Sequence, residues 1–395
     1  MAKQVNTSHH IEVWHDDFWK LNVANFFITL PVYMLVAVLP VWLLKYVELS
    51  DMQVASTMGI YGCGVFLFGA VCSYLIQRYR RNKVCIISML LMVACILSIA
   101  YLSENLAEYN LVRWVFPIVL VLRALLGAFF GLSFMILNST LIVDCCDTSK
   151  RTLANVVSAW SYRLAIVVGM FLGLWLEKEF GFLNTIYLSA FFSMLSVGIL
   201  SSVSFPFKAP DESLHVFSLD RFFRLSSMRL VTSTFMIAAL LGVTVVVFQG
   251  IASYLGLLFG VLLSLLVQKI PFVAYKKRGM VLFCYLLLAL SVLCQWCSYL
   301  PWLSVASCVL TGFSLSAVLT VFHREFIDTA DHCQRGTSQS TFMLSFESGF
   351  SLGIFVSTLS TVELHTLFIS YVFLLLSVAC YFYRSKIIVF DKPGK

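Results

Sequence analysis

The sequence predicts an all-α polytopic membrane protein with twelve transmembrane helices. Of its 395 residues, 60% are apolar and only 12% are charged, and the mean hydropathy is +0.91. A soluble domain has about 45–50% apolar and about 25% charged residues, so this composition excludes a soluble enzyme, a nucleic-acid-binding protein and a disordered chain. At about 20 residues a span, the apolar residues suffice for roughly twelve helices.

Twelve apolar segments follow one another along the chain, separated by short polar turns. They cover residues 18–44, 54–76, 84–102, 113–143, 152–176, 182–205, 229–248, 251–273, 279–298, 301–326, 337–358 and 366–383. Each is long enough to cross the hydrocarbon core of a bilayer as a helix. The polar residues 1–17 lack the basic region of a signal peptide, so we expect the first apolar segment to be a permanent span.

The basic residues are divided unequally between the two sets of loops. Of the 27 lysines and arginines, 22 fall on the side that also carries both chain ends. Lysine and arginine are enriched in cytoplasmic loops, so this distribution places both termini in the cytoplasm. It also supports an even number of spans.

The longest loop divides the chain into two groups of six spans. We expect an N-terminal bundle over residues 1–205, a cytoplasmic linker over 206–228 and a C-terminal bundle over 229–395. A shift of 184 residues superposes parts of the two groups, and the identical pairs are Asp144 and Asp328, Asp147 and Asp331, Arg151 and Arg335, Ser161 and Ser345, Gly169 and Gly353, and Phe171 and Phe355. Three of these pairs are charged residues of one loop, which favours two homologous bundles over coincidence.

Two charged motifs carry a resemblance to a known family. The loop after span two keeps Arg78 and Arg81 of the pattern Gly-x-x-x-Asp-Arg-x-Gly-Arg-Arg/Lys, although Ser73, Gln77 and Arg80 replace its Gly, Asp and second Gly. Span four carries Arg123 followed by Gly127, which is similar to an Arg-x-x-x-Gly motif. The chain thus resembles the major facilitator superfamily, in a bacterial branch with a degenerate span-two loop. This resemblance implies two six-helix bundles with a substrate site between them near the midplane, and it associates Arg123 with proton coupling.

Three charged residues lie deep inside predicted spans. Glu347 is the one acidic residue near the middle of a span. The 184-residue repeat makes its position equivalent to that of Arg163, which carries the opposite charge. Arg123 is the third buried charge. Intramembrane charges are costly and usually mark a transport path, so we expect Glu347, Arg163 and Arg123 to form one proton and substrate site. The alternative is a structural ion pair that only joins helices.

Polar and charged residues elsewhere define a possible pocket and a possible gate. The pocket candidates are Asn22, Asn25, Asn138, Trp160, Tyr162 and Gln249. The gate candidates at the cytoplasmic ends of the spans are Arg78, Arg81, Asp144, Asp147, Arg151, Asp328, Asp331 and Arg335. The alternative for the pocket candidates is packing and hydrogen bonding between helices. The alternative for the gate candidates is helix capping by aspartate together with the basic charge typical of cytoplasmic loops.

Other patterns suggest chemistry that the sequence supports poorly. His323 and Asp328 fit a His-x4-Asp acyltransferase pattern, but Asp328 already has a repeat partner in Asp144. We expect the adjacent Cys145 and Cys146 to pack as small apolar side chains. We expect the histidines near the N-terminus to belong to a disordered tail. We therefore expect no metal, no cofactor and no enzymatic activity.

The function that these observations predict is secondary active transport. We expect a permease that moves a small organic solute by alternating access, as a proton-coupled symporter or antiporter, in a bacterial inner membrane. Its partners are then the solute, protons and the lipid bilayer, with no nucleic acid, and the protein is a monomer. The alternatives are a membrane sensor or scaffold that has kept a transporter fold, and an integral membrane enzyme that modifies lipids.

Overall fold

The structure is a computed structural model of the chain. It describes residues 14–105, 112–142, 145–146, 151–203, 216–217, 222–248, 250–268, 277–296, 301–331, 334–360 and 363–383.

The described residues form helices and no strands, which confirms the predicted fold class. The helices are α1 (Asp16–Lys45), α2 (Asp51–Gly64), α3 (Gly69–Arg78), α4 (Arg81–Glu104), α5 (Val112–Ile136), the π-helix η1 (Leu137–Leu141), α7 (Arg151–Phe180), α8 (Phe182–Ser201), the 3₁₀ turn η2 (Leu225–Ser227), α9 (Met228–Val247), α10 (Ile251–Gln268), α12 (Lys277–Trp296), α13 (Pro301–Asp328), α14 (Arg335–Leu359) and α15 (Glu363–Phe382). Twelve helical segments are long and apolar enough to cross a membrane, as the sequence predicts.

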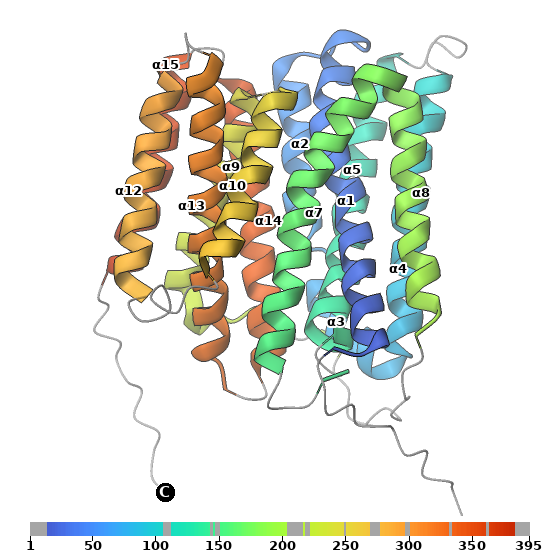
Figure 1. The fold of residues 1–395 in the computed structure, drawn as a ribbon. Helices are drawn as coiled ribbons and strands as arrows, with labels where there is room; N and C mark the ends of the chain where they lie inside the picture. Colours follow the sequence, from blue (N-terminus) through green and yellow to red (C-terminus); the bar gives the residue numbers. More distant parts are fainter. Residues whose placement is uncertain are drawn as a thin grey trace, which may run out of the picture.

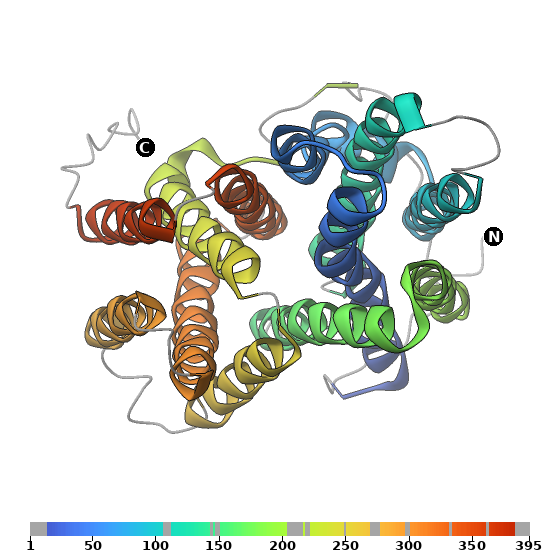
Figure 2. The same cartoon turned by 90° about the horizontal axis from the view of Figure 1, so that it is seen from above.

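The helices stand side by side in two groups (Figure 1). Seen from above, the segments up to α8 lie on one side and those from α9 onward on the other (Figure 2). In the first group α1 packs on α7 and α8, and in the second α9 packs on α14 and α15. Across the boundary, α2 packs on α14, and α7 packs on α10 and α13. These crossing pairs surround the region between the two groups.

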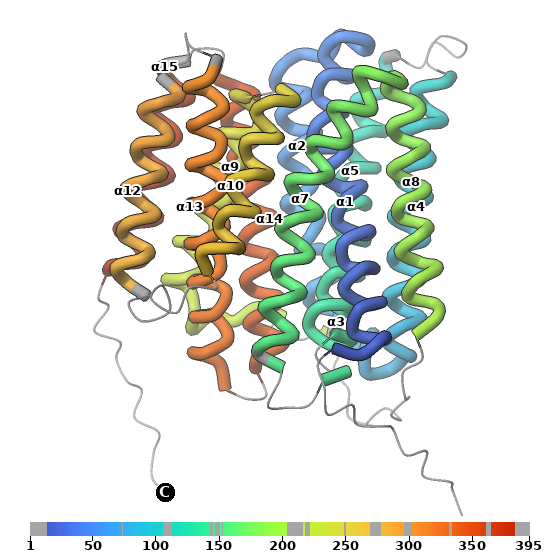
Figure 3. Tube along the Cα trace, viewed as in Figure 1, coloured from blue at the N-terminus to red at the C-terminus, as the bar shows by residue number. Residues whose placement is uncertain are grey.

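Successive spans run in opposite directions, so α1 begins at the same end of the bundle at which α15 finishes (Figure 3). We call this end the terminal face and the other end the opposite face. α1 is the most enclosed span, because 83% of its most apolar window is buried inside the protein. A helix that is apolar all round is expected in such a position, surrounded by other helices rather than by lipid.

Two predicted spans differ from continuous α-helices. The second is divided by turns at residues 65–68 into α2 and α3. The fourth changes at its end into η1, whose π-helical turn contains the buried Asn138. Local π-helical turns occur frequently at functional sites, because the extra residue alters which side chains face a neighbouring helix. No apolar pattern in the sequence marks either change.

Glycine allows close helix contacts both within and between the groups. Within the second group, a Cβ atom on Gly353 of α14 would lie 2.0 Å from the carbonyl oxygen of Ala239 of α9. Between the groups, a Cβ atom on Gly62 of α2 would lie 2.7 Å from Cβ of Ser351 of α14. Small residues let transmembrane backbones approach closely and gain packing energy. The contact at Gly62 fixes how near α2 lies to α14.

Candidate functional site

Glu347 lies at the midpoint of α14 and has no exposed surface. Twelve residues separate it from each end of the helix, which corresponds to about 18 Å of helix on either side. Because half of a typical hydrocarbon core is about 15 Å thick, a bilayer centred on this helix places Glu347 near its middle. The structure thus has Glu347 at the middle of its helix, the position that the sequence predicts.

Two tyrosines of the first helix group hold the carboxylate of Glu347. The hydroxyl of Tyr33 on α1 donates a hydrogen bond of 3.0 Å to Oε1, and the hydroxyl of Tyr162 on α7 donates to the same oxygen. The two hydroxyl oxygens lie 3.4 Å apart. Among the described residues, Oε2 has no hydrogen-bond partner. The carboxyl group is thus bound through one oxygen only, by residues of the other helix group.

Arg123 of α5 lies close to this carboxyl group without pairing with it directly. It is 1% exposed, and its guanidinium carbon lies 4.9 Å from the centre of the Tyr61 ring of α2. Arg123 and Glu347 carry opposite charges, and such charges attract each other more strongly in surroundings that exclude water. In the described part of the chain no ion pair joins Glu347 to an arginine. A cation over an aromatic ring is stabilised by the ring's electrons, so Tyr61 takes the place of a carboxylate partner.

Arg163 of α7 contacts α13 of the second helix group. Its Nη1 donates to the hydroxyl of Thr320 and, at 3.2 Å, to the backbone oxygen of Ser316, both on α13. The Trp160 ring, one turn earlier on α7, lies 5.4 Å from the guanidinium carbon. Of the three charges predicted to form one site, the structure therefore brings Glu347 and Arg123 into one tyrosine-lined group, and Arg163 into a neighbouring contact with α13.

Contacts between the two helix groups occur on both sides of Glu347 along α14. Towards the opposite face, Ser351 packs against Gly62 of α2. Towards the terminal face, the hydroxyl of Ser340 lies 2.8 Å from that of Ser139 in η1. The carboxyl group is therefore enclosed between two interhelical contacts.

Three of the predicted pocket residues belong to a buried hydrogen-bond network or lie beside it. Asn138 donates from Nδ2 to Oδ1 of Asn25 at 2.9 Å, and Asn25 donates to the backbone oxygen of Ser158 at 3.1 Å. The hydroxyl of Ser158 donates to Oδ1 of Asn138. Asn22 is buried nearby on α1 and donates to its own helix at Phe18. The network joins three spans of the first group, which is the packing role that the sequence left open.

The other three pocket candidates divide differently. Trp160 is half-buried and stacks on Arg163, as described above. Gln249 lies outside the described residues. Tyr162 is the predicted pocket residue that contacts the buried acid directly.

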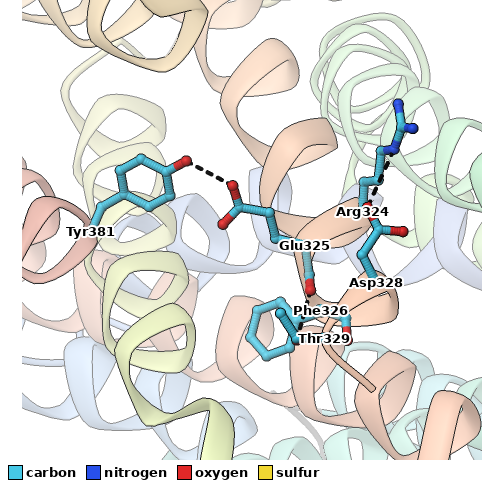
Figure 4. A network of polar contacts seen from close by, with 6 residues as sticks. All are labelled: Arg324, Glu325, Phe326, Asp328, Thr329 and Tyr381. Carbon is cyan, nitrogen blue, oxygen red and sulfur yellow. Dashed lines mark hydrogen bonds and ion pairs between the residues drawn. The ribbon is translucent and has the colours of Figure 1, made fainter. Parts of the chain in front are cut away.

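The gate candidates that the structure describes lie at the terminal face. Asp328 is exposed at the end of α13 and forms an ion pair of 3.5 Å with Arg324, one turn earlier on the same helix (Figure 4). Glu325 accepts a hydrogen bond of 2.8 Å from Tyr381 of α15 (Figure 4). The remaining gate candidates are the exposed Arg78 and Asp331, the half-buried Arg81, Arg151 and Arg335, and Asp144 and Asp147, which lie outside the described residues.

Arg224 is a residue of this face that the sequence analysis overlooked. It lies near the end of the linker, and its backbone N–H donates to the Thr341 hydroxyl of α14 at 2.9 Å. Its guanidinium donates to the backbone oxygen of Thr329 at 2.5 Å. The end of the linker is therefore fastened to α13 and α14. An arginine in a connecting loop carries no sequence signal for such a contact.

His323 belongs to a polar contact inside the second group. Its Nε2 forms a hydrogen bond with Oε1 of Gln339, and both residues are buried. Asp328, the acid of the His-x4-Asp pattern, pairs with Arg324 instead. The pattern therefore does not describe a His–Asp contact in this structure.

Tyr33 and Tyr61 complete the surroundings of Glu347 and Arg123, and the sequence analysis did not select them. Both are buried inside apolar spans, where tyrosine resembles any other large core residue. Their hydroxyl groups were the available signal, since a buried tyrosine hydroxyl usually requires a polar partner.

Comparisons with known proteins agree with this arrangement. The family model described as Major Facilitator Superfamily matches residues 21–275. A mutant of the nucleoside transporter NupG has a crystal structure similar to this chain, with a TM-score of 0.66, 12% sequence identity, and coverage of 93% of this chain and 98% of the other. A bacterial homologue of the iron transporter ferroportin, in an outward-facing state, gives a TM-score of 0.65 at 15% identity and the same coverage. At such identities these likenesses show the fold alone. No curated protein matched the sequence.

Proposed function

Because the chain belongs to the Major Facilitator Superfamily, we propose that it is a proton-coupled secondary transporter of a small organic solute. The observation that carries the proposal is the carboxyl group of Glu347, which is fully buried and bound through one oxygen by Tyr33 and Tyr162. A carboxyl group in this position can bind or release a proton, and its protonation changes the strength of a contact between the two helix groups.

In this proposal the two groups are the units that move. Residues 1–205 and 229–395 rotate against each other about the central site, and residues 206–228 connect them. The deprotonated Glu347 accepts hydrogen bonds from α1 and α7 and favours the closed arrangement. Protonation removes the charge that attracts both tyrosine hydroxyls, so it weakens this contact and allows the groups to separate.

Arg123 and Arg163 have separate roles in the proposal. Arg123 stabilises the charged form of Glu347 through space, since its own partner is the Tyr61 ring rather than a carboxylate. Arg163 holds α7 against α13 through Thr320 and Ser316, and it is the cation that an anionic group of the solute would meet. The network of Asn25, Asn138 and Ser158 keeps the first group rigid.

The location follows from the distribution of charge. The excess of lysine and arginine on one set of loops supports an inner-membrane protein with both termini in the cytoplasm. The terminal face is then the cytoplasmic face, and Arg224 fastens the linker there. We propose that the transporter acts as a monomer with the lipid bilayer around it.

Two steps test the function. A thermal-shift screen of the purified protein against metabolites, in acidic and in neutral buffer, first identifies a solute, because a ligand at 100 times its Kd stabilises by about 2.7 kcal/mol. Proteoliposomes then measure whether a pH gradient drives accumulation of this solute. Wild type and the exposed-surface control Glu179→Gln should accumulate it, and Glu347→Gln should not. Equal accumulation by all three proteins would contradict the role of Glu347, and a bound solute that is never transported would favour a sensor.

A further inference from the structure

The start of α1 and the segment after η1 bring together three metal-binding side chains. They are His15, Cys145 and Cys146, and their ligand atoms all lie within 4.8 Å of one another. His15 is 130 residues from Cys145, so only the packing of the first and fourth spans creates the cluster. We propose that His15, Cys145 and Cys146 bind a zinc ion at the terminal face.

The distance between the two sulfur atoms fits this ion. Sγ of Cys145 and Sγ of Cys146 lie 3.8 Å apart. A tetrahedral zinc ion with Zn–S bonds of about 2.3 Å holds two sulfur ligands about 3.8 Å apart. The two sulfur atoms therefore need little movement to share an ion. Both thiols release their protons to solvent on binding, and Cys145 gives up the hydrogen bond from its Sγ to the backbone oxygen of Ile142. The imidazole nitrogen completes three protein ligands. The fourth position remains open to water, as in zinc sites with three protein ligands.

The donor set favours zinc over the common hard cations. Thiolate and imidazole are soft or borderline ligands, which select zinc or copper(I), whereas magnesium and calcium prefer oxygen. Cys145 and His15 are half-buried and Cys146 is 5% exposed. The cluster is therefore partly open, so an ion can enter it from solution.

The hydrogen bonds of His15 orient the ring for this role. Its Nδ1 accepts a bond of 3.2 Å from the backbone N–H of Phe18, and its Nε2 lies 3.0 Å from the backbone oxygen of Cys145. A zinc ion would replace one of these two bonds. The other would remain and fix the ring, which is how partners outside the metal's own ligands usually orient a ligating histidine.

Zinc at this position would join two spans of the first helix group. His15 caps the first turn of α1, and the cysteines follow the π-helical turn that carries Asn138. The ion would act from the terminal face on the same pair of spans that Asn25 and Asn138 connect inside the membrane. This inference does not depend on the proposed transport activity.

The test is a zinc-binding measurement on the full-length protein after removal of any purification tag. In equilibrium dialysis with excess Mg²⁺ present, wild type should hold one more zinc ion than the double variant Cys145→Ser/Cys146→Ser. His15→Ala should weaken zinc binding at least about 10-fold. Removing a residue that only orients a metal ligand already lowers metal affinity about 10-fold, and His15 is proposed as a ligand itself. The matched controls Cys63→Ser and His365→Ala, each at an exposed site, should bind as wild type.

A second measurement uses wild type alone and so does not depend on the folding of a variant. Zn²⁺ should slow the alkylation of Cys145 and Cys146, followed residue by residue by mass spectrometry, and should leave the rate at exposed Cys63 unchanged. Equal zinc content in wild type and the double cysteine variant would overturn the proposal. Unchanged alkylation rates at Cys145 and Cys146 would overturn it as well.

Discussion

Arg163 and Glu347 hold equivalent places in the two halves of the repeat, and each binds the half to which it does not belong. Arg163 of α7 donates to Thr320 and Ser316 of α13, and Glu347 of α14 accepts from Tyr33 and Tyr162. The two buried charges therefore form separate connections between the helix groups instead of pairing with each other. A motion that separates the groups must break both connections.

The connection at Arg163 can be measured as a coupling energy. We expect a double-mutant cycle of Arg163→Gln and Thr320→Val to give about 0.6–1.7 kcal/mol, the range found for hydrogen bonds between membrane helices. Unfolding in mixed detergent micelles supplies the four free energies of unfolding. Thr320→Val combined with the distant Glu179→Gln is the control and should be additive. A coupling below about 0.3 kcal/mol for the first pair would contradict the contact.

Removing the hydroxyl of Tyr162 tests the other connection. Tyr162→Phe should lower the free energy of unfolding by about 0.6–2 kcal/mol, because a buried carboxyl oxygen loses a donor that crosses between the groups. It should also impair pH-driven accumulation of the solute. Tyr46→Phe is the control, since Tyr46 is 65% exposed. Equal stability and equal transport in the two variants would show that the hydrogen bond to Glu347 has no role.

Asn138 supports the rigidity of the first group. Asn138→Ala leaves Oδ1 of Asn25 without its hydrogen-bond donor and the Ser158 hydroxyl without its acceptor, so we expect a loss of about 1–3 kcal/mol in the free energy of unfolding. The control is Asn184→Ala, whose exposed side chain donates to the backbone oxygen of Phe180, four residues earlier at the end of α7, and it should change stability by less than about 0.5 kcal/mol. Similar losses in both variants would contradict a special role for the network.

The contact of α2 with α14 is open to a steric test. Gly62→Ala places a methyl group 2.7 Å from Cβ of Ser351, so the two helices must move apart near the opposite face. Spin labels at the exposed positions Met52 and Leu359, in a background without native cysteines, should show a longer distance. Gly198→Ala is the control, because a Cβ atom there meets nothing within 4 Å. An unchanged distance in Gly62→Ala would mean that this contact does not set the spacing of the groups.

The sequence predicts the twelve spans and the position of Glu347 at the middle of its helix well, since both follow from the apolar pattern along the chain. Local hydropathy does not predict partners that lie far apart in the chain. Tyr33 is 314 residues from Glu347, and His15 is 130 residues from Cys145. Each of these contacts depends on how helices pack, and no local pattern records it.

The sequence also does not reveal changes of helix type within a span. The π-helical turn at Asn138 alters one hydrogen-bond register and leaves the apolar pattern of the span unchanged. The repeat placed Arg163 and Glu347 at equivalent positions, but equivalence alone does not say which helix each one faces. The structure adds that direction, and with it the separation of the predicted three-charge site into two contacts.

The most direct test of the central claim is whether Glu347 binds a proton inside the membrane. Infrared difference spectroscopy of the purified protein between neutral and acidic buffer reports the carbonyl band of a protonated carboxyl group in an apolar setting. We expect this band in wild type and in Glu179→Gln, and its loss in Glu347→Gln. A band that persists in Glu347→Gln, or that is missing from wild type, would contradict Glu347 as the proton-carrying residue.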